Sequence, residues 1–136
     1  MSTIKRYTRL LLVPGIVLFF LGGCGSDKNP LSAFEPEIIN TADAFQFQIT
    51  DASGVTTTVS YPWTNTGAQA TINHSTVTTQ GSATVYIMDA DTTQVYTAGL
   101  VASLNEESSA GTAGAWTVRV VFENFSGTAN FRVEKL

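Results

Sequence analysis

The sequence predicts an all-β fold, with a single antiparallel β-sandwich of seven to eight short strands over residues 43–136. From Asp43 onward, apolar and polar residues alternate with a period of two, as they do in half-buried strands. Clusters of Gly, Asn, Asp and Ser interrupt this alternation at regular intervals, and no helical period is visible. Short, evenly spaced strands are typical of a sandwich, and the length fits one domain.

The alternation also places each strand along the chain. The expected strands are residues 44–49, 55–61, 70–79, 83–88, 94–100, 102–104, 116–122 and 131–133. The second of these ends at Pro62 or lies at a sheet edge, because proline cannot donate to a ladder. The expected turns and loops are Asp51–Gly54, Asn65–Gly67, Gln80–Gly81, Asp89–Asp91 and Ser108–Gly114.

The last two expected strands form a hairpin whose loop length decides its register. A four-residue loop, 124–127, places Arg119 opposite Arg132, whereas a two-residue turn, Ser126–Gly127, places Arg119 opposite Glu134. Like charges directly opposite are unfavourable, since cross-strand pairs are worth roughly 0.2–1 kcal/mol. We therefore expect the two-residue turn, although Ser-Gly is a weaker hairpin signal than Asn-Gly.

The N-terminal segment has the pattern of an export signal. Three cations, the last of them Arg9, precede an apolar run, Leu10–Leu21, and no acidic residue occurs before Asp27. The run of 12 residues extends roughly 18 Å as a helix, which is well short of a hydrocarbon core of about 30 Å. We therefore expect a cleaved signal rather than a transmembrane helix.

The only cysteine, Cys24, directly follows Leu21-Gly22-Gly23. This stretch resembles the bacterial lipobox, and the resemblance implies that residues 1–23 are a lipoprotein signal peptide. It also implies that Cys24 carries a diacylglyceryl group and further acyl chains such as palmitate, which together exceed the marginal hold of one chain. Gly25 after the cysteine, by analogy with enteric lipoproteins, favours the bacterial outer membrane, with a periplasmic or a surface-facing domain.

Residues 24–42 are expected to form the lipidated N-terminus and an extended tether. Pro30 and Pro36 block a continuous helix there and favour extended neighbours. Some of the tether could still dock onto the sandwich through its apolar side chains, which are Leu31, Phe34, Ile38 and Ile39.

Composition excludes nucleic acid as a partner. Residues 1–23 contain three cations and no acid, so their removal leaves 113 residues and changes the formal net charge from −4 to −7. An acidic chain of this kind has no electrostatic footprint for nucleic acid. With Cys24 lipidated, no disulfide is available in an oxidising compartment, so stability is expected from the core alone.

Four stretches of the expected sandwich resemble the bacterial pre-peptidase C-terminal domain, a β-sandwich appended to secreted enzymes. They are Ala44–Phe47, Val85–Asp91, Gly114–Val120 and Gly127–Val133. Ala115-Trp116 stands where that family has Gly-Tyr. The resemblance implies a sandwich fold and an accessory, non-catalytic role, and it transfers no catalytic or binding residue.

No catalytic or cofactor motif is visible. His74 is the only histidine, it shares the parity of apolar neighbours, and no Gly-x-Ser-x-Gly elbow accompanies it. A hydrolase would need His74 in a cleft beside a carboxylate and a hydroxyl. Asp89 and Asp91 could offer carboxylates to Ca²⁺, but without the rest of an EF-hand they are more typical of a turn.

Aromatic residues are the remaining lead to a ligand. Tyr61, Trp63, Tyr86 and Tyr96 could line a sheet face for stacking on a sugar or a peptide, or could fill the core instead. We therefore expect a non-catalytic envelope lipoprotein, without a cofactor, that is held to the membrane through Cys24. Its partner is expected to be an envelope protein or a glycan, and carbohydrate binding through the aromatics is the alternative function.

Overall fold

A computed structural model describes residues 29–136; the predicted signal peptide, the predicted lipobox and Cys24 lie outside the described residues. The described part has one 3₁₀ turn and seven strands, and every strand pair is antiparallel. The elements are η1 (Ser32–Phe34), β1 (Glu37–Thr41), β2 (Ala44–Asn65), β3 (Ala70–His74), β4 (Val77–Met88), β5 (Gln94–Gly99), β6 (Leu104–Glu107) and β7 (Gly114–Lys135). The predicted all-β, antiparallel fold is confirmed. Within residues 29–136, no helix has the length and apolarity to span a bilayer.

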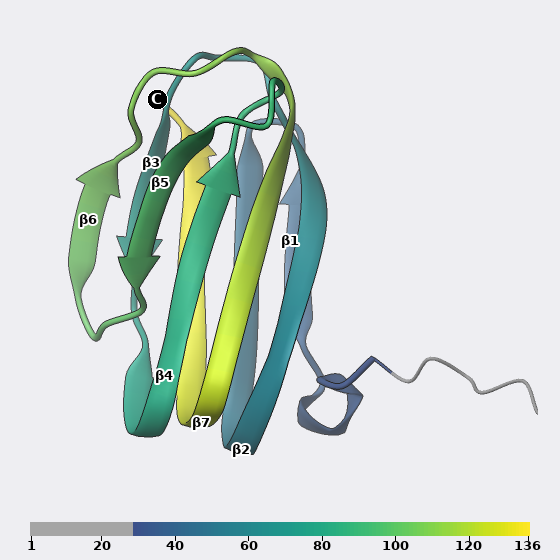
Figure 1. Cartoon of the computed structure of the whole chain (residues 1–136), viewed down its shortest axis with the longest axis vertical. Helices are drawn as coiled ribbons and strands as arrows, with labels where there is room; N and C mark the ends of the chain where they lie inside the picture. Colours follow the sequence, from purple (N-terminus) through teal and green to yellow (C-terminus); the bar gives the residue numbers. More distant parts are fainter. Residues whose placement is uncertain (1–28) are drawn as a thin grey trace, which may run out of the picture.

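Two long strands, β2 and β7, hold the two layers together. Each has 22 residues, and they pair from Ala44–Glu134 at one end to Asn65–Gly114 at the other. Halfway along, both strands bend from one layer into the other (Figure 1). The five-stranded layer contains β1, the first half of β2, the second half of β7, β3 and β6. The four-stranded layer contains the second half of β2, the first half of β7, β4 and β5.

The bends lie together at one end of the sandwich, here called the closed end, which is at the bottom of Figure 1. Asp51 and Gly54 in β2, Gly81 in β4 and Gly127 in β7 all have positive φ, between 51° and 133°. The pairing register shifts at the bends of β2 and β4, as in β-bulges. The chain folds back at these segments from one layer into the other, while the pairing of the strands continues through the bend.

The chain thus reverses at the predicted turns Asp51–Gly54 and Gln80–Gly81, but β2 and β4 do not end there as expected. The predicted hairpin with the two-residue turn is wrong, and the four-residue alternative does not occur either. Residues 116–122 and 131–133 belong to the one strand β7. Arg119 pairs with Ser60 and Tyr86 in the four-stranded layer, while Arg132 lies in the other layer. The cause is that a bulge and a turn use the same residues, since both require positive φ.

The opposite end, here called the open end, contains four of the connections between strands. The connections there are Ala42–Asp43, Thr66–Gln69, Asp89–Thr93 and Ser108–Ala113. The C-terminus also lies at this end (Figure 1). Two of these connections cross from one layer to the other, because Thr66–Gln69 links β2 to β3 and Ser108–Ala113 links β6 to β7.

The folded region begins earlier than the predicted boundary at residue 43. The sheet starts with β1, which pairs with β2 from Glu37 onward. Before it, Leu31 is fully buried in the core and Phe34 packs against the core, next to the bend of β2. Ile38 and Ile39, by contrast, are exposed. The predicted tether of residues 24–42 is thus folded from Leu31 on, because one leucine closes the end of the core.

The core is aromatic and lies between the layers. Trp63 and Trp116 meet edge to face at 5.8 Å between ring centroids, and both are buried. Each indole N–H donates to a backbone carbonyl, that of Thr41 for Trp63 and that of Thr112 for Trp116. Buried indoles with satisfied N–H groups combine a large apolar contact with fixed geometry.

Candidate functional site

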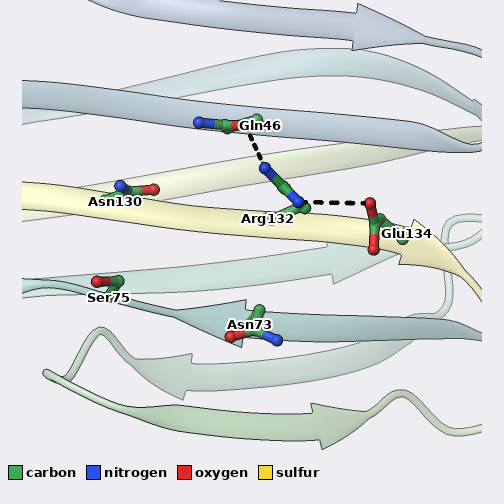
Figure 2. Close-up of a pocket in the computed structure, with 6 residues that line it drawn as sticks. All are labelled: Gln46, Asn73, Ser75, Asn130, Arg132 and Glu134. Carbon is green, nitrogen blue, oxygen red and sulfur yellow. Dashed lines mark hydrogen bonds and ion pairs between the residues drawn. The ribbon is translucent and has the colours of Figure 1, made fainter.

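A shallow depression of about 300 Å³ lies on the outer face of the five-stranded layer (Figure 2). Its side chains come from three neighbouring strands, β2, β7 and β3, and from Ser75, which directly follows β3. Its lining residues are Gln46, Asn73, Ser75, Asn130, Arg132 and Glu134.

The period of two positions these side chains. On β2, Phe45 and Phe47 are buried, so Gln46 between them points outward. On β7, Phe131 and Val133 are buried in the same way, so the residues on either side of them also point outward. A slip of one residue would exchange the two faces, so burial of the aromatic rings fixes which polar groups are presented.

Arg132 lies at the centre of the depression and is held from two sides. Its Nη2 donates to Oε1 of Gln46 at 3.0 Å, and its Nη1 lies 3.8 Å from Oε1 of Glu134, as Figure 2 shows. Beside them, the amide of Asn130 donates to Oε1 of Gln48 at 3.1 Å. The Arg132–Glu134 pair is about half exposed, so it orients the groups more than it stabilises the fold.

The same pattern extends across the whole layer. The register places Ile39, Gln46, Arg132, Asn73 and Asn105 in one row from edge to edge. We call the polar part of this surface the amide face; it consists of Gln46, Gln48, Asn73, Asn105, Asn130, Arg132 and Glu134. At its rim, the side chain of Ile39 is 55% exposed and offers an apolar contact.

The chemistry of the amide face suits binding rather than catalysis. A carboxamide both donates and accepts hydrogen bonds, which matches the hydroxyl groups of a sugar. The centre carries one positive and one negative charge, and the acidic residues Glu37 and Glu107 point outward at the two rims. This charge distribution disfavours an anionic ligand. The depression is shallow, so an extended ligand that crosses several strands fits it better than a small enclosed one.

The structure does not bring the four predicted aromatic residues together. Trp63 is 2% exposed, so its prediction as a sugar-stacking residue is wrong. The ring of Tyr61 packs on Phe45 and Phe47, with centroid distances of 5.6 and 6.0 Å. Burial raises the pKa of Tyr61, whose hydroxyl has no partner among the described residues. The rings of Trp63 and Tyr61 both belong to the core. This is the alternative that their positions on the inward face of a half-buried strand had left open.

Tyr96 lies inside the sandwich, in contact with His74. Its hydroxyl donates to Oε2 of Glu106 at 2.9 Å and lies 3.1 Å from Nε2 of His74. Burial, followed by the Glu106 carboxylate, raises the pKa of Tyr96. Burial lowers the pKa of His74, and Glu106 opposes that shift. A buried histidine beside a firmly protonated phenol is a poor arrangement for hydrolysis, which needs an accessible nucleophile.

Tyr86 is the one predicted aromatic residue that lies on an outer face. It projects from the four-stranded layer, where the guanidinium carbon of Arg119 lies 4.8 Å from the centre of its ring. It is therefore on the side of the molecule opposite the amide face and contributes nothing to it.

The two weak candidates for calcium binding, Asp89 and Asp91, hold a turn. The carboxylate of Asp89 accepts backbone N–H groups from Asp91, Thr93 and Thr112, at 2.8 to 3.0 Å. The bond from Thr112, with those from the other two amides, lowers the pKa of Asp89 against the effect of burial. Asp91 accepts the Thr112 hydroxyl at 2.6 Å. Within residues 29–136 no three His, Cys, Asp or Glu side chains are placed to hold a metal ion together.

Sequence reasoning missed the amide face because its residues belong to no motif. The signal that could have found it is the outward parity of Gln46 and Gln48 between buried phenylalanines. The same parity on β7 selects Asn130, Arg132 and Glu134. The wrong hairpin placed those β7 residues beside the wrong neighbours, so the surface could not be assembled.

Comparison with known proteins assigns no family to this chain. No family model matches it, and no curated protein matches it. One similar solved structure is described as the structure of infectious bursal disease virus Gt strain, with 17% identity and a TM-score of 0.29. The match covers 74% of this chain and 32% of the viral chain, so this chain spans about a third of it. At that TM-score the likeness carries no argument.

Proposed function

We propose that the protein is a non-catalytic, lipid-anchored module of the bacterial envelope that binds a neutral polysaccharide through the amide face. The observation that carries the proposal is the row Gln46–Arg132–Asn73, in which two carboxamides flank an oriented guanidinium. Such groups form paired hydrogen bonds with neighbouring sugar hydroxyls. The carbohydrate-binding hypothesis is thus kept, but with a different site from the predicted aromatic one.

Glu134, Glu37 and Glu107 support a neutral ligand over an acidic one. The carboxylate of Glu134 at the centre is offset by Arg132, whereas those of Glu37 and Glu107 at the rims pair with no cation among residues 29–136. An anionic polymer that crossed the layer from β1 to β6 would pass both rim carboxylates. A neutral chain meets no such repulsion, and Ile39 offers the apolar side of a sugar ring a contact at one rim.

The proposed anchor fits the position of the first buried residue. Leu31 is buried beside the closed end, and only the six residues 25–30 separate it from Cys24. Six extended residues reach at most about 20 Å. Under this proposal the closed end faces the membrane, and the strands of the amide face run away from it.

Binding is tested with the full-length mature protein in detergent and a panel of neutral bacterial polysaccharides. We expect Arg132→Ala and Gln46→Ala each to weaken binding at least tenfold, about 1.4 kcal/mol. Thr58→Ala, a small polar change on the four-stranded layer, is the matched control. Equal binding by Arg132→Ala and Thr58→Ala would contradict the amide face as the site. Capture of an envelope protein by the wild type, lost in Arg132→Ala, would instead favour a protein partner.

The anchor is tested separately. Cys24→Ser should abolish lipid attachment and signal cleavage, because the thiol is the atom that is alkylated in lipoproteins. Mass spectrometry of the membrane fraction measures both effects. A mature chain of unchanged mass in the Cys24→Ser variant would refute lipidation.

A further inference from the structure

A second polar feature lies at the centre of the four-stranded layer, on its outer face. The register places Ser60, Arg119, Tyr86 and Thr97 in one row across β2, β7, β4 and β5. Arg119 lies over the ring of Tyr86, 4.8 Å from its centroid. A guanidinium stacked on a ring in this way has a fixed plane, so less rotamer freedom is lost when it binds.

Arg119 has no carboxylate partner in the part of the chain that the structure describes. The ion pairs within residues 29–136 join Arg132 to Glu134 and Lys135 to Asp43. Arg119 takes part in neither, and its Nε is buried without a hydrogen-bond partner among the described residues. In a chain with net charge −4, the guanidinium of Arg119 is therefore free to meet an acidic ligand rather than an acid of the described residues.

The surroundings of Arg119 are uncharged. The outward neighbours on the adjacent strands are Thr58, Ser60, Thr84, Met88 and Thr97, and those on β7 are Thr117 and Val121. The nearest acid along β7 on this face is Glu123, four residues away, or roughly 13 Å at the rise of a strand. The Ser82 hydroxyl donates to its carboxylate.

These groups define what the surface can bind. A guanidinium presents a planar fork of donors that matches a carboxylate. Short hydroxyl side chains lie on both sides of the guanidinium. A sugar ring that carries the carboxylate could therefore rest on the layer and form hydrogen bonds between its own hydroxyls and these side chains. In the middle of the layer, β7 is paired on both sides, so a peptide cannot be added there as an extra strand.

We propose that Arg119 and Tyr86 form a binding site for the carboxylate of an acidic sugar in a polysaccharide. The site lies on the face opposite the amide face and recognises a charged group rather than neutral hydroxyls. This proposal does not rest on the proposed function. A negative result for one site leaves the proposal for the other site unaffected.

The test is titration calorimetry of the full-length mature protein in detergent, with trigalacturonate as the probe. We expect binding that weakens at least tenfold in Arg119→Met and that falls as salt is added, as for an ionic contact. Arg119→Lys should recover only part of the affinity, because lysine keeps the positive charge but lacks the planar pair of N–H donors of the guanidinium. Galactotriose, which lacks the carboxylates, should not bind this face. A glutamate-rich peptide should bind more weakly than trigalacturonate.

A second variant tests the site without removing the arginine. Ser60→Glu places a carboxylate opposite Arg119 and should block trigalacturonate at least tenfold. Thr64→Glu makes the same change further along β2, on the same face, and should have little effect. Arg132→Ala should leave trigalacturonate binding unchanged. The proposal is overturned if trigalacturonate does not bind, if Ser60→Glu binds it like wild type, if Arg132→Ala loses it, or if the peptide binds more tightly.

Discussion

The two ends of the sandwich are stabilised by different means. At the closed end, backbone segments approach so closely that only glycine fits. A Cβ on Gly127 would overlap the carbonyl oxygen of Val77, and one on Gly81 would overlap those of Glu123 and Asn124. At the open end, two carboxylates hold the loops. Asp89 accepts three backbone N–H groups, and Asp43 binds both Thr66 and Lys135.

Because of this difference, we expect the two ends to respond differently to mutation and to acid. The closed end depends on shape, so it should be sensitive to any added atom and nearly insensitive to pH. The open end depends on ionised carboxylates, so it should accept changes elsewhere in its loops and weaken when protonated. Loops held by a few side chains can vary in sequence while the bent strands stay fixed.

The largest expected effect is at Gly127. Gly127→Ala adds a methyl group against the Val77 carbonyl at a φ of 133°, and we expect a loss of about 3–5 kcal/mol in the free energy of unfolding. Gly99→Ala is the control, since nothing lies within 4 Å of its Cβ position. Urea denaturation of both variants measures the difference. Similar midpoints would mean that the strand crossing is looser than described.

Gly54→Ala separates backbone strain from overlap at the same end. Its φ is 60°, but the nearest atom to an added Cβ is the Asn124 side chain at 3.7 Å. Only the left-handed conformation is then unfavourable, which costs about 1–2 kcal/mol. A loss as large as that of Gly127→Ala in the same denaturation series would show that strain, not overlap, dominates the closed end.

At the open end, the largest effect is expected for Asp89→Ala. It leaves the N–H groups of Asp91, Thr93 and Thr112 without their acceptor, so the two connections they join should open. Amide hydrogen exchange should accelerate at those residues while exchange at the buried strand residues stays slow. Asp91→Ala is the control, because it removes only the contact with the Thr112 hydroxyl. Equal acceleration in both variants would contradict the role of Asp89.

The sequence predicts the layers of this fold better than it predicts their connections. Alternation identified nearly every buried strand residue, because one face of each strand must pack on the core. It could not show that β2 and β7 continue through Gly54 and Gly127, since a bulge and a reversal use the same residue types. Whether the ladder continues through the bend or ends there depends on the pairing of β2 with β7, about 70 residues apart in sequence at the bend.

The candidate surfaces were harder to predict for the same reason. Trp63 and Tyr61 share the parity of core residues, so the core alternative was already open for both. Gln46 meets Arg132 only through a pairing between distant strands, which no local pattern encodes. Asp89 and Asp91 were correctly weighed as turn residues, because a carboxylate followed by free amides is a local feature.

Acid should act on the open end through Asp43. Lys135, with the Thr66 amide, lowers the pKa of Asp43 from 3.8 to about 2. The unfolded chain therefore binds this proton first, so the stabilisation is complete above about pH 4 and is lost as pH falls toward 2. Asp43→Asn should be less stable than wild type at pH 6, and the gap should close on acidification. Asp51→Asn makes the same change at the closed end and is the control.

Urea midpoints between pH 2 and 6 measure that gap. If Asp43→Asn and wild type lose stability in parallel as the pH falls, the Asp43–Lys135 pair does not carry the acid sensitivity of the open end. Asp89, whose pKa is also lowered, would then be the remaining group to replace.

The smallest expected effect lies between the two ends. His74 ends β3 opposite Phe131, midway along the five-stranded layer, and burial lowers its pKa below 6.5 although Glu106 opposes the shift. The unfolded chain takes up this proton first, so stability should decline as pH falls from about 6.5 toward the folded pKa. His74→Gln keeps a donor for the Tyr96 hydroxyl and should lose that decline.

His74 is the only histidine, so one imidazole signal in an NMR titration reports its pKa directly. A value above 6.5 would mean that the Glu106 carboxylate, reached through Tyr96, outweighs burial. Mild acid would then strengthen the middle of the five-stranded layer while it weakens the open end. The comparison of the two ends would have to include a third region, whose response to pH is opposite to that of the open end.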